Sequence, residues 1–205
     1  IDLLRVNTLS SELTKIDNRA DQLAPVIDNR NQVWTLPTKA GEAIQAHDAN
    51  GKLLFSQSGW LSQGDHLAFG ISREGTRLAV LLKSKSGTAV YVAAIKRDEY
   101  GTPIGVYSPR RVALGTSGMF SLAWSGVNTL VAVASGSNAS DVPKQIIVGG
   151  GVTEITSMTD AKTILAQTDS SAIYLLDKNN ILFEYRSSSW LGVETGVIAA
   201  HFIGN

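Results

Sequence analysis

The clearest pattern along this chain is a series of short apolar segments separated by turn-forming residues. The segments are rich in Val, Ile, Leu and Thr, and Gly, Asn, Asp or Pro stands between them. Such runs predict β-strands joined by tight turns. In the stretch 69–82, for example, one apolar segment, the turn Arg73–Gly75 and a second apolar segment follow one another. Glycine suits this turn because it readily adopts a positive φ.

The strands fall into groups of four that repeat along the chain. In each group the second strand is almost continuously apolar, as expected of a strand covered on both faces. Equivalent positions in these second strands recur at intervals of 45, 52 and 43 residues. The aligned residues are Val33, Leu78, Leu130 and Ile173. A four-stranded unit with this period is typical of a β-propeller blade.

The sequence therefore predicts an all-β chain, with residues 1–205 forming one β-propeller domain or a fragment of a larger propeller. About four full, four-stranded antiparallel blades and part of another are expected. The full blades are expected at 21–58, 65–115, 119–158 and 162–197, with a partial blade at 1–20 and a closing strand at 198–205. An open arc would leave strand edges and an apolar blade face bare, which favours self-association. A β-sandwich is the alternative, because short strands at this spacing also fit that fold.

Composition supports a folded domain and argues against two kinds of partner. Hydrophobic residues make up 43% of the 205 residues, which provides a core and excludes intrinsic disorder. The 18 basic and 18 acidic residues balance, so no basic excess indicates nucleic-acid binding. No apolar run approaches the ~20 residues of a membrane-spanning helix. The absence of cysteine excludes disulfides and thiolate metal sites.

The histidines and one acidic turn do not form a metal or cofactor site. No second ligand stands at metal-binding spacing from His47, His66 or His201, and we interpret all three as surface or loop residues. The segment Asp48–Gly51 matches only the start of a calcium loop and is predicted to be a hairpin turn.

Motifs for catalysis are incomplete. The Gly149–Gly151 segment lacks the lysine of a phosphate-binding loop, and Gly115–Gly118 does not complete a nucleophile elbow. The first strands of the blades carry Asp28, Asp65 and Asp169 only near their ends. We therefore predict no catalytic residues and a protein that is not an enzyme. The alternative is a glycan-binding or glycan-cleaving propeller that uses a polar axial channel.

The four tryptophans divide into two pairs. Trp34 and Trp124 lie inside strand patterns and are predicted to pack between blades. Trp60 and Trp190 stand beside loop sequence, where they are candidate contacts for a protein partner, although packing is the slightly favoured role. The stretch 135–144 is predicted to be a long surface loop that contains the glycosylation sequon at Asn138.

Several stretches, in order along the chain, carry a family resemblance. They are LAPVIDNRNQVWTL (23–36), AFGISREGTRLAV (68–80), VYVAAIKRD (90–98), GTP (101–103) and LAWS (122–125). This succession resembles the C-terminal β-propeller of the LpqB-type lipoproteins of actinobacteria, from about Leu3 to the end of the chain. One departure is a turn with Asn31–Gln32 before Trp34, where the family often has Asp–Gly.

The resemblance implies a non-catalytic protein-interaction module in the cell envelope. Family members are extracytoplasmic, and a GerMN-type domain and an N-terminal lipid anchor precede the propeller. Both are expected to lie outside residues 1–205, and the lipid anchor would provide the only membrane association. The implied partner is the extracytoplasmic domain of an MtrB-type sensor histidine kinase, which the lipoprotein assists as an accessory in a two-component system.

Overall fold

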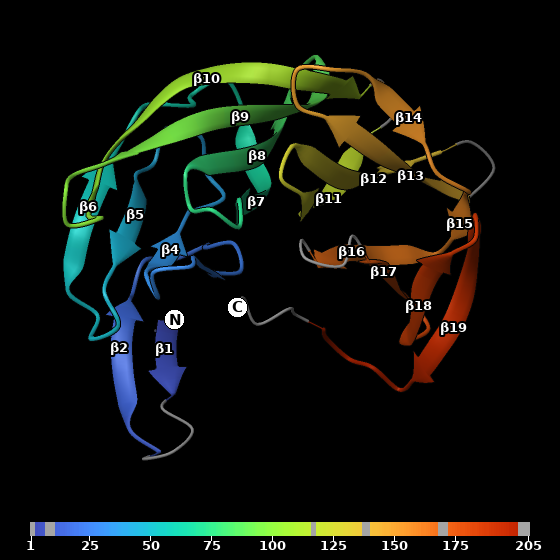
Figure 1. Cartoon of the computed structure of the whole chain (residues 1–205), viewed down its shortest axis with the longest axis horizontal. Coiled ribbons are helices and arrows are strands. Elements are labelled where there is room, and N and C mark those ends of the chain that lie inside the picture. Colours follow the sequence, from blue (N-terminus) through green and yellow to red (C-terminus); the bar gives the residue numbers. More distant parts are fainter. Residues whose placement is uncertain (1–2, 7–10, 116–117, 137–139, 168–171, 201–205) are drawn as a thin grey trace.

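The computed structural model shows four antiparallel sheets set around a common axis (Figure 1). It describes residues 3–6, 11–115, 118–136, 140–167 and 172–200. Each sheet is built on four strands that are consecutive in the sequence, and the third sheet has a short fifth strand; we call these sheets blades 1 to 4. In the described residues, no helix is long and apolar enough to cross a membrane.

Within each blade the chain runs from the strand nearest the axis to the outermost strand (Figure 1). Blade 1 contains β3 (Val26–Ile27), β4 (Val33–Thr35), β5 (Ile44–His47) and β6 (Leu53–Gln57). Blade 2 contains β7 (Asp65–Ile71), β8 (Arg77–Ser84), β9 (Gly87–Arg97) and β10 (Pro103–Gly115). Blade 3 contains β11 (Met119–Gly126), β12 (Thr129–Ser135), β13 (Ser140–Ile147) and β14 (Val152–Glu154), and the short β15 (Met158–Thr159) also pairs with β13. Blade 4 contains β16 (Ala161–Gln167), β17 (Ala172–Asp177), β18 (Ile181–Arg186) and β19 (Ser189–Thr195).

A separate two-stranded sheet precedes blade 1. It consists of β1 (Leu3–Val6) and β2 (Leu13–Asp17). The backbone of β2 closely approaches the β5–β6 turn, because a Cβ added at Gly51 would lie 2.3 Å from the carbonyl oxygen of Lys15. The β-propeller prediction is confirmed, and the β-sandwich alternative is not what forms.

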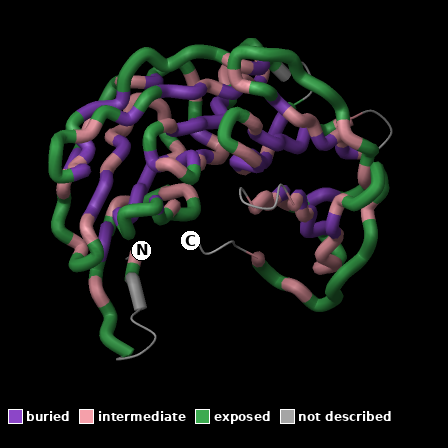
Figure 2. The backbone as a smooth tube through the Cα atoms, in the orientation of Figure 1, coloured by how far each residue is buried: buried purple, intermediate pink, exposed green. Residues whose placement is uncertain are grey.

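Blades pack face to face through strands that are buried on both sides. Along β8, Leu78 and Val80 join the apolar cluster between blades 1 and 2, whereas Ala79 and Leu81 join the cluster between blades 2 and 3. This alternation arises because successive side chains of a strand point to opposite faces of the sheet. The same pattern repeats in β12, and Figure 2 shows these inner strands as the buried part of the molecule. The continuously apolar second strands are therefore explained by two buried faces.

Aspartates begin several of the hairpin turns. In each of the turns after Asp28, Asp48 and Asp98, the carboxylate oxygen Oδ1 accepts hydrogen bonds from the backbone N–H groups two and four residues later. Asn31 at φ 62° and Gly51 at φ 82° occupy the left-handed position that closes two of these turns. The predicted hairpin turn at Asp48–Gly51 is confirmed.

The loop predicted for 135–144 is wrong, because β13 begins at Ser140. Pro143 lies inside this strand, where its lack of an N–H donor would ordinarily argue against a strand. The carbonyl group of Pro143 points outward and accepts a hydrogen bond from Ile155, in the interval between β14 and β15. The backbone nitrogen of Pro143, which has no hydrogen to donate, therefore lies opposite the break between β14 and β15. Asn138 lies outside the described residues.

The closing strand predicted at 198–205 is not formed in its described part. Residues 198–200 have no strand structure, and 201–205 lie outside the described residues.

We expect the interblade clusters to supply most of the folding free energy. Leu130→Ala removes a fully buried side chain between blades 2 and 3 and should lower the free energy of unfolding by about 2–5 kcal/mol. Leu114→Ala, on the exposed side of β10, should change it by less than about 1 kcal/mol. Urea unfolding followed by tryptophan fluorescence measures both, and equal losses would contradict this account of the core.

Candidate functional site

The turns between the first and second strands of blades 1 to 3 lie at one end of the molecule. We call the segments 28–32, 72–76 and 127–128 the inner turns; they connect β3 to β4, β7 to β8 and β11 to β12. Two arginines of blade 2 join these turns to one another.

Arg97, at the end of β9, joins the inner turns of blades 1 and 2. Its Nη2 lies 2.6 Å from Oδ2 of Asp28, and this pair is almost fully buried. Its Nη1 donates to Oε1 of Gln32 at 2.5 Å, and its Nε donates to the Gly75 carbonyl oxygen at 3.0 Å. The guanidinium also lies over the ring of Trp34, whose Nε1 donates to the same Asp28 carboxylate at 2.9 Å. These bonds satisfy a buried charge pair, which is otherwise costly.

Arg77, at the start of β8, joins the inner turns of blades 2 and 3. Its Nε donates to Oε1 of Glu74 at 2.9 Å, and its Nη1 donates to Oδ1 of Asn128 at 2.7 Å. Nη2 also donates to the Val127 carbonyl oxygen, and the guanidinium lies over the ring of Trp124. Burial would raise the pKa of Glu74, but its hydrogen bonds with backbone and with Arg77 hold the pKa below its usual range.

A cleft lies between these joined turns. It has a volume of ≈ 440 Å³ and is lined by Asn29, Arg73, Glu74 and Val127, so each inner turn contributes to it. Val127 is 63% exposed at the tip of its turn. This arrangement places charged side chains beside an exposed aliphatic side chain, a combination that suits noncovalent binding without catalysis.

A second polar cluster connects β2 to blade 1. The carboxylate of Asp17 is almost fully buried and accepts hydrogen bonds from Arg19 Nε at 2.9 Å and from Thr35 Oγ1 at 3.0 Å. Burial alone would raise the pKa of Asp17, but the hydrogen bonds from Arg19 and Gln22 hold it well below its usual range. Arg19 also donates to the Ala43 carbonyl oxygen, so this cluster fixes the two-stranded sheet against blade 1.

The prediction that the histidines lie on the surface or in loops is wrong for His47 and His66. Both are buried, in β5 and β7 respectively. Burial lowers the pKa of His47, although the charge of nearby Asp17 opposes this effect. His66 is held between two backbone carbonyl oxygens, with Nδ1 2.7 Å from that of Pro37 and Nε2 3.3 Å from that of Leu61. His201 lies outside the described residues.

The tryptophans confirm one prediction and leave the other open. Trp34 and Trp124 are buried between blades, as predicted. Trp60 and Trp190 are half-buried and pack against the blade 1–2 and blade 3–4 clusters. Trp190 Nε1 donates to the Thr156 carbonyl oxygen at 2.8 Å, whereas Trp60 Nε1 meets no acceptor among the described residues. Their role as partner contacts stays a prediction.

The candidate acidic residues are not brought together. Asp28 is engaged by Arg97, Asp65 lies at the opposite end of β7 from the inner turn, and Asp169 is outside the described residues. Within the described ranges, no group of three or more His, Asp or Glu residues could hold a metal ion. The Gly149–Gly151 segment forms the turn between β13 and β14.

Sequence reasoning missed the two arginines that join the inner turns. Arg77 and Arg97 lie in strand segments that read only as charged strand ends, and their partners are up to 69 residues away in the chain. The available signal was the position of each arginine at the turn end of its strand, but nothing in the sequence pairs it with a particular turn.

Comparison with known families identifies this fold more closely. The family model of the lipoprotein LpqB β-propeller domain matches residues 2–200. The chain belongs to the LpqB β-propeller family. The predicted family resemblance is therefore confirmed over nearly the whole chain. No curated protein matches the sequence.

Solved structures share the fold at low sequence identity. A chain of the nidogen/laminin complex aligns with a TM-score of 0.62 at 15% identity, over 93% of this chain and 70% of that one. A chain of Kuenenia stuttgartiensis hydrazine synthase aligns with a TM-score of 0.64 at 12% identity, over 94% and 60%. The β-propeller domain of Myceliophteria thermophila Cps50 (Swd1) aligns with a TM-score of 0.53 at 11% identity, over 78% and 51%. These similarities support the propeller fold alone.

The lowered pKa of His47 predicts a loss of stability on mild acidification. As the pH falls below about 6.5, the unfolded chain binds a proton at this site that the folded protein resists, so acidification favours unfolding. Thermal unfolding midpoints should therefore fall between roughly pH 7 and pH 5, and His47→Gln should flatten this part of the profile. The lowered pKa of Asp17 also makes acidification destabilising, but only once the pH approaches the ordinary pKa of 3.8. The contributions of Asp17 and His47 to the pH profile can therefore be separated. An unchanged slope in the His47→Gln variant would contradict the assignment.

Proposed function

We propose that this protein is a non-catalytic protein-interaction module of a cell-envelope lipoprotein. The family match over residues 2–200 carries this proposal, because the matching family is a β-propeller domain of a lipoprotein. In this role the module is extracytoplasmic and is tethered to the cell membrane through a lipid anchor elsewhere in the full-length protein.

The proposed partner is the extracytoplasmic domain of an MtrB-type sensor histidine kinase in an actinobacterial cell. The propeller would act as an accessory that modulates this two-component system by binding. A rigid scaffold that presents turns at its surface suits such a role, since binding residues concentrate on loops held by a scaffold. The balanced charge of the chain is consistent with a protein partner in place of nucleic acid.

The inner strands support a binding role over glycan cleavage. Among the described residues of β3, β7, β11 and β16, Asp65 is the sole carboxylate. Cleavage of a glycosidic bond generally uses two carboxyl groups on opposite sides of the bond. The fold itself does not decide between these roles, because the similar solved structures include both a protein complex and an enzyme.

A binding titration tests the proposal. The soluble extracytoplasmic part of the full-length lipoprotein should bind the purified sensor domain saturably, and removal of the propeller should abolish this binding. Isothermal calorimetry gives the affinity, and sedimentation of each protein alone shows whether the propeller self-associates. Absence of binding at about 100 μM, with both proteins folded, would overturn the proposed partnership.

A further inference from the structure

The interval between blade 4 and the β1–β2 sheet is the open side of the ring. We propose that this open side is the docking site of a β-hairpin that directly precedes residue 1 in the full-length protein. The hairpin would pair with the inner edge of β1 and complete a fifth four-stranded blade between blades 4 and 1. This inference goes beyond the proposed function, because it concerns how the propeller closes in the protein alone.

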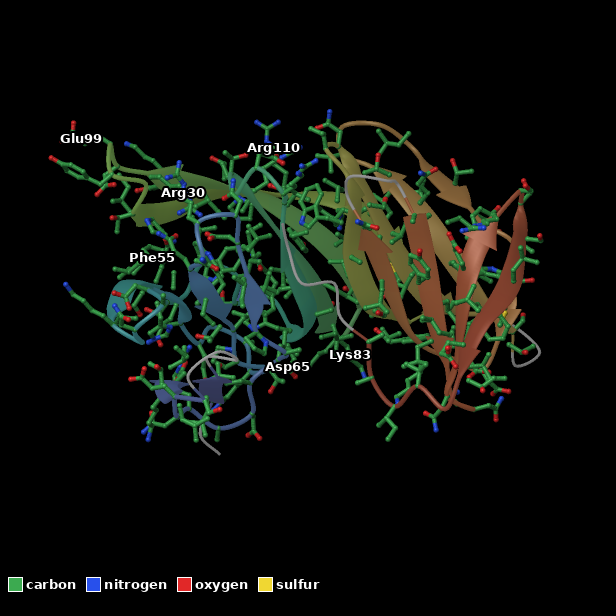
Figure 3. All side chains as sticks on the ribbon, turned by 60° about the horizontal axis from the view of Figure 1, so that its bottom comes forward. Arg30, Phe55, Asp65, Lys83, Glu99 and Arg110 are labelled. Atoms are coloured by element: carbon green, nitrogen blue, oxygen red, sulfur yellow. The ribbon has the colours of Figure 1, made fainter. Side chains whose placement is uncertain are left out.

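Blade 4 and the β1–β2 sheet stand apart around the axis. Figure 1 shows the separation, and Figure 3, in which the open side is turned toward the reader, shows it again. Among the described residues, blade 4 therefore packs on blade 3 through one face and meets no blade with the other. A propeller ordinarily closes so that each blade lies between two neighbours.

The second strand of blade 4 is apolar on both faces, although only one face meets a blade. Ile173 and Leu175 of β17 join the cluster between blades 3 and 4. Leu176 points to the other face, and Leu182 is paired with it. Leu191 of β19, on the same free face, is 49% exposed. Because the equally apolar strands β8 and β12 are covered on both sides, the pattern of β17 predicts a further covering layer.

The other wall of the open side is only half covered. Asp17 of β2 bonds to Thr35 of blade 1, and the backbone of β2 reaches the β5–β6 turn at Gly51. Nearer the axis, Ile27 of β3 is 46% exposed, although it lies on the same face of blade 1 as the buried Val33. The outer part of this face is therefore covered by β2, and the inner part is not.

The order of the strands identifies what would cover the inner part. In every described blade, four consecutive strands run from the axis outward. β1 lies nearer the axis than β2, and β2 lies beside the outer turn of blade 1, so the pair occupies the third and fourth positions of a blade (Figure 1). The first and second positions then belong to residues directly before β1. One further blade period before Val33 likewise reaches ahead of residue 1.

Two observations favour such a hairpin over other occupants. Residues 198–200, at the described C-terminal end, have no strand structure and do not pair with β1. The inner edge of β1 has no neighbouring strand among the described residues, and a hairpin would pair with it. A hairpin joined directly to β1 is also held at a high local concentration, so it docks without the loss of freedom that a second copy would incur.

The lack of cysteine in residues 1–205 permits a labelling test in the soluble form of the full-length protein. Ile27→Cys and Leu191→Cys place a thiol on the open side, and Leu114→Cys on β10 is the matched control. These side chains are 46%, 49% and 57% exposed, so without a docked hairpin the thiols should react with a maleimide at similar rates. Figure 3 shows Arg110, also on β10, far from the open side. The unaltered protein gives the background labelling, and thermal unfolding of each variant checks the fold.

If the hairpin docks, the thiols of Ile27→Cys and Leu191→Cys should react at least about tenfold more slowly than that of Leu114→Cys. This protection should hold at every protein concentration and without the sensor domain. Amide hydrogen exchange should also be slow in the residues directly before residue 1, as expected of paired strands.

Equal labelling of the three variants would show that the open side is uncovered and would overturn the inference. Protection that appears only as a dimer forms in sedimentation, or only after the sensor domain is added, would also overturn it, because a second copy or the partner would then be the cover. Protection together with rapid exchange before residue 1, for example with slow exchange in 201–205 instead, would contradict the assignment to the hairpin. The measurement on the protein alone does not depend on sensor binding, so its failure leaves the proposed function to be decided by the titration.

Discussion

The ion pair between Asp28 and Arg97 fixes blade 1 against blade 2 at the end of the molecule that carries the cleft. Both groups are removed from water, and desolvation of a buried pair can cost as much as its attraction returns. The pair is therefore a poor source of net stability. Its value lies in geometry, because Arg97 satisfies its buried charge only when Asp28, Gln32 and Gly75 occupy particular positions.

Two kinds of contact therefore join neighbouring blades, and they have different roles. Apolar side chains on both faces of β8 and β12 hold neighbouring blades together, and this burial supplies the driving force. Apolar contact is not directional, so it leaves the turns free to settle in more than one place. Arg77 and Arg97 remove that freedom, and their stacking on Trp124 and Trp34 joins the turns to the buried core.

Much of the fold could be predicted from the sequence because its signals are local. The second strands show their two buried faces directly as continuous apolar runs, and turn residues such as Asp48 and Gly51 mark the hairpins. The strand containing Pro143 was missed because its tolerance of proline depends on a break in the neighbouring strand. The buried state of His47 and His66 depends likewise on segments distant in the chain.

The candidate site was harder to predict than the fold. Trp60 and Trp190 are half-buried against interblade clusters, and their role as partner contacts stays a prediction. The cleft depends on turns that are far apart in the sequence, with 44 residues from Asn29 to Arg73 and 53 from Glu74 to Val127, and that meet only when successive blades stack. Val127 carries no distinguishing sequence signal, and only the fixed turn beneath it makes its exposure informative.

Amide hydrogen exchange in an Arg97→Met variant tests the central claim most directly. If Arg97 holds the inner turns of blades 1 and 2, the amides of Arg30, Gln32 and Gly75 should exchange at least about tenfold faster in the variant. The amides of β12 in blade 3 should keep their rates, because Arg77 still holds the neighbouring junction. Unchanged rates at the first two turns, or a uniform increase over the whole protein, would contradict the account.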